Sequence, residues 1–363
     1  MDVQQRQTQR IWPIGKVLDT DKDTKILGMR WDAESEMNPA DLQTRGLTAS
    51  QFEDSTLWMN GPQWLTDLSA HEENILSNRS FTEGPEIRAQ QLQNVCRKLK
   101  DIGHIPIAIP RHSYQYMYVN DEYKFIFCMM PKLACTNWKR IFLALSDNFP
   151  NKDFVINKMG SGDVHDTWPK HGNTLDKYSY SDIQTKLQTY KKIVFVRDPF
   201  ERLLSAFKDK MFRKDTPVFK NIAEKIIRLK RSKEVNHSDA IKFVEFVKYL
   251  TDPDTFESSY EQHWAKYENL CQPCLMNYDF VGKFETMKND ISRTFKYLGI
   301  KIFNETVFPD RSVSYKNTES SKITQTFYNQ LPKTYLKKLW HLYKIDFHMF
   351  SYHMPDYLSG IDN

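Results

Sequence analysis

Two short segments of the chain combine the residue types that bind phosphate-like or sulfate-like groups. The first contains Lys132 and Thr136, and the second contains Arg197 and Ser205. A lysine supplies a compact positive charge, an arginine supplies a fork of N–H donors, and hydroxyl groups complete the coordination of an anion. The two segments together suit a ligand that carries two separated anionic groups.

The first segment lies between a predicted strand and a predicted helix. Residues 123–130 (YKFIFCMM) are aromatic and almost continuously apolar, which predicts a strand covered on both faces. Apolar residues from Trp138 to Leu145 repeat with the helical period, so the loop lies at a helix N-terminus, where N–H groups and the helix dipole favour anions. The P-loop spacing G-x-x-x-x-G-K-[ST] is absent. A plain connector with an N-cap threonine and a surface lysine is the alternative interpretation. The loop residues are Pro131, Lys132, Leu133, Ala134, Cys135, Thr136 and Asn137.

The second segment repeats this order of strand, polar loop and helix. Residues 193–196 (IVFV) predict a buried strand, after which Asp198 resembles an N-cap and Pro199 suits the first helical position. Glu201 falls at the reciprocal capping position. Only Arg197 and Ser205 therefore need a functional interpretation, and the alternative for Arg197 is a simple ion pair with Asp198 or Glu201. The segment consists of Arg197, Asp198, Pro199, Phe200, Glu201, Arg202, Leu203, Leu204 and Ser205.

These two segments resemble the nucleotide-binding motifs of Golgi carbohydrate sulfotransferases, in particular the chondroitin and dermatan 4-O-sulfotransferase type. In that family the first motif binds the 5′-phosphosulfate of 3′-phosphoadenosine 5′-phosphosulfate (PAPS), and the second binds its 3′-phosphate. A third block also matches: His263-Trp264, LCQPC at 270–274 and NYDFVGKFET at 277–286. The resemblance covers roughly residues 88–350, and Leu133 departs slightly from the smaller residue usual in the family.

The resemblance implies both a fold and an activity. We expect an α/β, P-loop-like sulfotransferase domain at 121–350, a central mostly parallel sheet flanked by helices, after a helical lead-in at 76–120 and before a C-terminal tail at 351–363. The implied activity moves the sulfuryl group of PAPS to a sugar hydroxyl of a glycosaminoglycan or N-glycan. O4 of N-acetylgalactosamine in chondroitin or dermatan is the leading acceptor, and terminal N-acetylgalactosamine or O3 of glucuronic acid are the alternatives.

Sulfuryl transfer depends mostly on positioning and electrostatics. Lys132 is the candidate for neutralising the leaving phosphate, and the scheme requires no metal. His165, expected in a loop that closes over the acceptor, is the candidate base because histidine titrates near neutral pH. Glu201, Asp163 and His263 are the weaker candidates.

The five cysteines leave the redox state open. Cys128 and Cys135 are expected to be packed free thiols. Cys271 and Cys274 form a C-x-x-C without a second pair at metal spacing, so zinc is not expected. In an oxidising lumen one or both could form disulfides, with Cys96 as the obvious third thiol.

Composition excludes little. A net charge of +5 is too small to argue for nucleic-acid binding, although the basic run at 228–233 could face a polyanionic glycosaminoglycan or simply be a solvated helix end. A nucleotide kinase or NTP hydrolase is disfavoured because the Walker lysine loop and an evident magnesium carboxylate are absent.

The N-terminal region carries a separate resemblance. Residues 1–75 resemble pieces of a Pao-type retrotransposon polyprotein (KILGMRWD, NPADLQTRG and LWMNGPQWL), and we expect a poorly ordered fused fragment without activity of its own. A chimera that does not function is therefore the second hypothesis. The family implies a Golgi location and a membrane anchor, but no run of eighteen apolar residues is visible. Sequons at Asn78, Asn236 and Asn304 are compatible with the secretory pathway.

Overall fold

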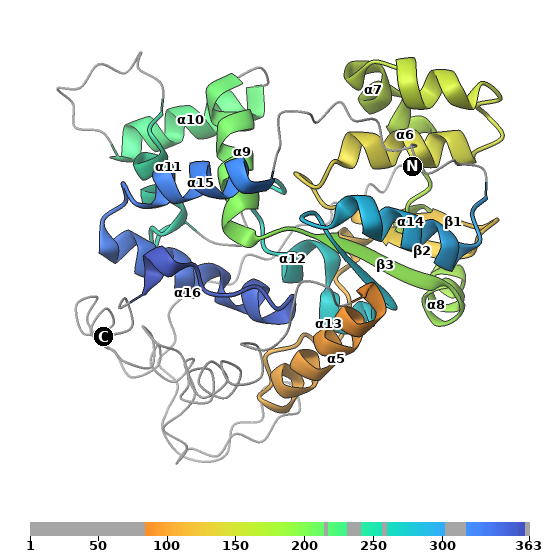
Figure 1. Ribbon diagram of the computed structural model, residues 1–363, viewed down its shortest axis with the longest axis horizontal. Helices are drawn as coiled ribbons and strands as arrows, with labels where there is room; N and C mark the ends of the chain where they lie inside the picture. The colour runs from red at the N-terminus through yellow and green to blue at the C-terminus, as the bar shows by residue number, and fades with distance from the viewer. Residues whose placement is uncertain (1–83, 214–216, 231–240, 256–259, 302–316, 360–363) are drawn as a thin grey trace, which may run out of the picture. The chain divides into compact units, whose positions relative to one another are not determined.

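Figure 1 shows a computed structural model of the chain, which describes residues 84–213, 217–230, 241–255, 260–301 and 317–359. All of these residues belong to the compact unit Asp67–Asn363. The predictions for 1–75, for the three sequons and for the basic run beyond residue 230 lie outside the described residues.

Four strands of the described residues form one mixed sheet in the order β1-β2-β3-β4. The two central strands, β2 (Phe125–Cys128) and β3 (Lys191–Val196), and the edge strand β4 (Phe280–Lys283) are parallel to one another, as predicted. The first strand, β1 (Met117–Asn120), pairs antiparallel with β2 and was not predicted. Because β2 and β3 are parallel neighbours, the loops that follow them leave the same edge of the sheet.

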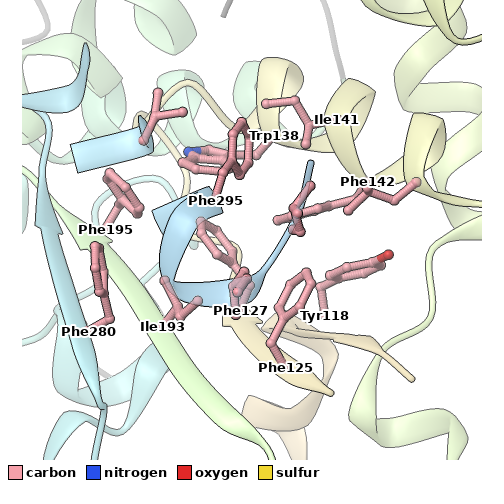
Figure 2. Packing of buried hydrophobic residues seen from close by; sticks show 14 of the residues in the cluster. Tyr118, Phe125, Phe127, Trp138, Ile141, Phe142, Ile193, Phe195, Phe280 and Phe295 are labelled. Atoms are coloured by element: carbon pink, nitrogen blue, oxygen red, sulfur yellow. The ribbon is translucent and has the colours of Figure 1, made fainter. Parts of the chain in front are cut away.

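One face of the sheet is packed with aromatic side chains. Alternate strand residues, including Phe127 and Phe195, point into this layer, which helices α6 (Cys135–Leu145) and α14 (Met287–Leu298) cover. Figure 2 shows the ring of Trp138 among them; its centroid lies 4.6 Å from that of Phe127 and 4.8 Å from that of Phe195. The packing holds the first turn of α6 against the two central strands, which positions the loop between β2 and α6.

On the opposite face, one disulfide joins the sheet to a helix and a second joins two helices to each other. Cys128, in β2, is bonded to Cys271 at the end of α12 (Tyr267–Cys271). Cys96, in α5 (Pro85–Asp101), is bonded to Cys274 in α13 (Pro273–Met276). The expectation of a free thiol at Cys128 is therefore wrong, because strand alternation turns this side chain away from the aromatic layer and toward α12.

The expectation of a free thiol at Cys135 is confirmed.

The remaining helices of the described residues are α7 (Ser161–His171), α8 (Tyr180–Thr189), α9 (Pro199–Arg213), α10 (Pro217–Lys230), α11 (Phe243–Leu250), α15 (Asn317–Tyr328) and α16 (Lys333–Met349). One expectation differs here, because the expected loop around His165 is the helix α7. Within the described part of the chain, no helix is long and apolar enough to cross a membrane.

Candidate active site

The first loop makes two turns in the left-handed backbone region. Lys132 has φ 70° and Ala134 has φ 55°. Residues with a Cβ atom rarely adopt this region, and when they do they cluster at functional sites. Ala134 is also the N-cap of α6 and makes no side-chain cap, so the alternative of an N-cap threonine is wrong. The start of α6 therefore has no capping side chain that would compete with an anion for its first N–H groups.

The lysine of this loop, Lys132, is bound by a carboxylate of α9, the helix that follows the second loop. Lys132 Nζ donates a hydrogen bond of 2.9 Å to Asp209 Oδ2, in α9. Burial raises the pKa of Asp209, but the hydrogen bond and charge of Lys132 more than offset this, so that the pKa lies below its usual value. Lys132 therefore faces a negative charge within the protein itself.

The second loop starts α9 much as predicted. Asp198 Oδ1 accepts hydrogen bonds of 2.9 Å from the N–H groups of Phe200 and Glu201, which makes Asp198 the cap. Glu201 is not the reciprocal capping partner. The N–H of Asp198 donates instead to Glu285 Oε1 at 2.9 Å. Glu285, which follows β4, thus accepts the hydrogen bond from the Asp198 N–H that was expected of Glu201. The carboxylate of Glu201 is therefore available to other partners.

Arg197 lies at the end of β3 and is enclosed on several sides. Its Nη2 donates to Glu201 Oε2 at 3.0 Å and to Ser320 Oγ, in α15, at 2.9 Å. Its guanidinium carbon lies 4.5 Å from the ring centroid of Phe284. The simple ion pair of Arg197 with Glu201, which the sequence left open, is thus present in the ligand-free protein.

The third sequence block supports the second loop. The N–H of Phe284 donates to the carbonyl of Val196 at 2.7 Å, and Tyr352 Oη donates to Glu285 Oε2 at 2.8 Å. Burial raises the pKa of Glu285. Burial, together with the nearby Glu285 and Glu201, raises the pKa of Asp198 to about 7. The segment KFET belongs to the third block that resembles the sulfotransferase family. Nothing in the local sequence indicated that it contacts Arg197 and Asp198.

Arg202 connects the two loops directly. It is almost fully buried, and its Nε donates to the carbonyl of Pro131 at 3.3 Å, while Nη1 donates to the carbonyl of Ala265 at 2.8 Å. The structure thus gives Arg202 a positioning role between the two segments. Several other motif residues are packed in the core and not presented to a ligand: Leu133, Phe200, Leu203 and Leu204.

His165 faces the first loop from α7. Its Nε2 lies 3.2 Å from Thr136 Oγ1, and its Nδ1 accepts a hydrogen bond of 3.3 Å from Lys139 Nζ. Partial burial of the ring, followed by the charges of Lys139 and Lys210, lowers the pKa of His165 to about 4. The imidazole is therefore neutral at physiological pH, the protonation state that a base needs. Its position beside Thr136 comes from the helix and not from a loop.

His263 is the other histidine of this region. Its Nδ1 lies 2.6 Å from Glu261 Oε2, an arrangement that orients the ring. Burial lowers the pKa of His263, Glu261 opposes the shift, and the charges of Lys210 and Lys132 lower it further.

Asp163 and Glu201 are the candidate bases that the structure places less favourably. Asp163 stands two residues before His165 on the same helix, and residues at that spacing do not face each other. Glu201 is engaged with Arg197 and Ser320. No group of three or more histidine, cysteine or acidic side chains among the described residues could hold a metal ion.

Residues 115–353 match the model of the sulfotransferase family. Carbohydrate sulfotransferase 11 of Rattus norvegicus is 33% identical over 290 residues, which cover 78% of this chain and 80% of that protein. The chain belongs to the carbohydrate sulfotransferase family.

Other carbohydrate sulfotransferases are similarly related to the chain. Carbohydrate sulfotransferase 9 of Homo sapiens is 33% identical over 300 residues, 80% of this chain and 66% of that protein. Carbohydrate sulfotransferase 10 of Pongo abelii is 33% identical over 282 residues, 75% of this chain and 76% of that protein. No solved structure matches the chain. The match of the family model begins just before β1 and includes both loops and α16 of this carbohydrate sulfotransferase.

Proposed function

We propose that this carbohydrate sulfotransferase transfers the sulfuryl group of PAPS to a hydroxyl of a glycan. The observation that carries the proposal is the connection of the two loops. They leave neighbouring parallel strands, and Arg202 of the second donates to the carbonyl of Pro131 in the first. A single nucleotide with anionic groups at both ends can therefore contact Lys132 and Thr136 at one end and Arg197 and Ser205 at the other.

The reaction needs two contributions from the chain, a positive charge at the leaving oxygen and a base. The acceptor oxygen forms a bond to sulfur, while the bond between sulfur and the bridging oxygen of the 5′-phosphate breaks, and adenosine 3′,5′-bisphosphate leaves. Lys132 neutralises the charge that develops on that oxygen, for which it must exchange Asp209 for the phosphate. A base accepts the proton of the acceptor hydroxyl.

We assign the base to His165, because it is neutral and lies beside Thr136 of the first loop. His263 is the alternative, favoured by its contact with Glu261, which would stabilise the imidazolium after proton transfer. Replacing each histidine by alanine separates them. Loss of kcat with unchanged binding of adenosine 3′,5′-bisphosphate identifies the base, and a variant that keeps wild-type kcat is excluded.

The acceptor follows from the resemblance and not from the described contacts. We propose O4 of N-acetylgalactosamine in chondroitin or dermatan, with terminal N-acetylgalactosamine of N-glycans and O3 of glucuronic acid as the alternatives. Incubation with labelled PAPS and a panel of desulfated polysaccharides, followed by disaccharide mapping, distinguishes them. A Golgi lumenal location with membrane association belongs to the same proposal.

Calorimetry with adenosine 3′,5′-bisphosphate tests the nucleotide site. We expect saturable binding that Lys132→Ala and Arg197→Ala each weaken by at least about tenfold, since each removes a charge-assisted contact. Lys158→Ala, an exposed lysine on another segment, is the control and should bind normally. A folded wild-type protein that binds no adenosine 3′,5′-bisphosphate would overturn the proposal.

The second hypothesis, a chimera that does not function, has its own test. It is motivated by the retrotransposon-like resemblance of residues 1–75, which stays a prediction. Equal binding of adenosine 3′,5′-bisphosphate by residues 76–363 and by the full chain would favour a working catalytic domain. Binding by the shorter protein alone would show that the N-terminal segment interferes.

A further inference from the structure

Three side chains at the second loop form a closed hydrogen-bonded triangle. Arg197 Nη2 donates to Glu201 Oε2 at 3.0 Å and to Ser320 Oγ at 2.9 Å, and Ser320 Oγ donates to the same Glu201 oxygen at 2.9 Å. Arg197 and Glu201 are one helical turn apart, but Ser320 belongs to α15, more than a hundred residues later. One carboxylate oxygen thus receives both a guanidinium N–H and a hydroxyl.

The triangle marks a preformed position for an anionic oxygen. The side chain of Arg197 is only 3% exposed and lies against the ring of Phe284, so it is held in place. The side chain of Glu201 is 15% exposed and lies in the first turn of α9, so it is less enclosed than that of Arg197. Arg197 is therefore more enclosed than the carboxylate that it binds. A phosphate oxygen that replaced the carboxylate would find the same two donors at the same distances.

We propose that Ser320 is a further ligand of the nucleotide's 3′-phosphate, and that Glu201 Oε2 occupies the position of one phosphate oxygen until the nucleotide binds. The inference rests on the proposed function, because it assigns the ligand of Arg197 as that phosphate. It adds a residue from the C-terminal part of the chain to a site that the sequence placed entirely in two loops. It also gives Glu201 a definite role, which is to neutralise the buried guanidinium in the absence of nucleotide.

The test compares two nucleotides that differ only in the 3′-phosphate. Calorimetry on the full chain measures the ratio of the Kd for adenosine 5′-monophosphate to the Kd for adenosine 3′,5′-bisphosphate. In Ser320→Ala we expect the bisphosphate to bind about tenfold more weakly, with little change for the monophosphate, because a hydroxyl contact to the 3′-phosphate is lost. Ser320→Thr keeps the hydroxyl and should restore most of the ratio.

Two further variants sharpen the result. Glu201→Gln removes the competing charge, so the bisphosphate should bind severalfold more tightly while the monophosphate is unaffected. Ser321→Ala is the matched control, since it makes the same change at the adjacent, exposed position of α15. Circular dichroism and thermal midpoints confirm that each variant is folded.

The possible failures are distinguishable. If Ser320→Ala leaves the ratio at the value of Ser321→Ala, or weakens both nucleotides equally, Ser320 does not contact the 3′-phosphate and the inference is overturned. If Glu201→Gln weakens the bisphosphate, Glu201 supports the site and does not compete for it. If the folded wild-type chain binds neither nucleotide, the proposed function itself is wrong.

Discussion

Both candidate phosphate-binding cations are paired with carboxylates. Lys132 is bonded to Asp209, and Arg197 is bonded to Glu201. The nucleotide of the proposed function would have to exchange with these internal anions as well as with water, which lowers its net affinity. The same pairs hold the two cations in a defined place before the nucleotide arrives, which favours preorganisation over maximal affinity.

The protonation of His165 can be tested through Lys139. Lys139 donates to His165 Nδ1, and its charge is the second cause, after burial, of the lowered pKa of about 4. Removing a positive charge favours the protonated imidazole, so Lys139→Gln should raise the pKa of His165. We expect the acid limb of kcat/KM, which reports on the free enzyme, to move up by roughly half a pH unit or more.

The control for this experiment is Lys158→Gln, which changes an exposed lysine that is 69% accessible. It should leave the pH profile of kcat/KM where the wild type has it. An unshifted acid limb in Lys139→Gln would mean that the limb belongs to another group, and His263 would become the first candidate.

Asp198 makes a testable contribution to the pH dependence of stability. Its pKa is raised to about 7 by burial, so between about pH 4 and pH 7 the folded state binds a proton that the unfolded state has lost. This component of stability is therefore lost as the pH rises through that window. Asp198→Asn keeps an oxygen to accept from Phe200 and Glu201 but cannot ionise.

Thermal midpoints at about pH 5 and about pH 8 measure this effect. We expect the variant to lose less stability than the wild type between the two values, because the ionisation of the buried carboxyl is absent. Identical pH dependence of the two proteins would show that Asp198 titrates in the folded protein as it does in the unfolded chain.

At the scale of elements, the sheet sets the distance between the loops. The register pairs Cys128 with Val194 and Val194 with Val281, so the three parallel strands end close to the same level. The aromatic layer below then fixes α6 against β2 and β3 (Figure 2). A change in this packing should therefore disturb the first loop as well as the free energy of unfolding.

Gly282 of β4 allows a direct test of that packing. A Cβ atom at Gly282 would lie 2.4 Å from the ring of Phe195, which is itself packed against Trp138. Gly282→Ala should therefore lower the free energy of unfolding by about 1–3 kcal/mol, measured by urea denaturation. Gly162→Ala is the matched control, because a Cβ there meets no atom within 4 Å and the position is helical. Equal stability of the Gly282 variant and the wild type would contradict the packing described.

At the scale of the whole molecule, two disulfides connect segments that are distant in sequence. The bridge Cys96–Cys274 spans 178 residues and the bridge Cys128–Cys271 spans 143. The first bridge attaches α5 to α13, and the second attaches α12 to β2 on the face opposite the aromatic layer. A disulfide that closes such a long loop strongly restricts the conformations of the unfolded chain.

Removing either bridge should destabilise the protein. We expect the double variants Cys96→Ser with Cys274→Ser, and Cys128→Ser with Cys271→Ser, each to lose roughly 2–5 kcal/mol of unfolding free energy in urea denaturation. Cys135→Ser is the control, because Cys135 is a free thiol, and should change the value by less than about 1 kcal/mol. Unchanged stability in both double variants would mean that the bridges do not form in solution.

The amino-acid sequence by itself determined the features that depend on neighbouring residues. The apolar runs located β2 and β3, and the helical period located the helices that follow. Asp198 and Pro199 marked the start of α9 because capping is a contact between residues two or three positions apart. The cation-bearing loops after both strands could be recognised for the same reason.

Only the tertiary structure decided which distant residues meet. The sequence predicts a loop around His165, but α7, which packs on α6, places His165 in a helix. The disulfide partner of Cys128, the bond from Arg202 to Pro131 and the meeting of Arg197 with Ser320 join residues 71 to 143 positions apart. Contacts at such separations depend on how strands and helices pack, and a local pattern of residue types carries no record of that packing.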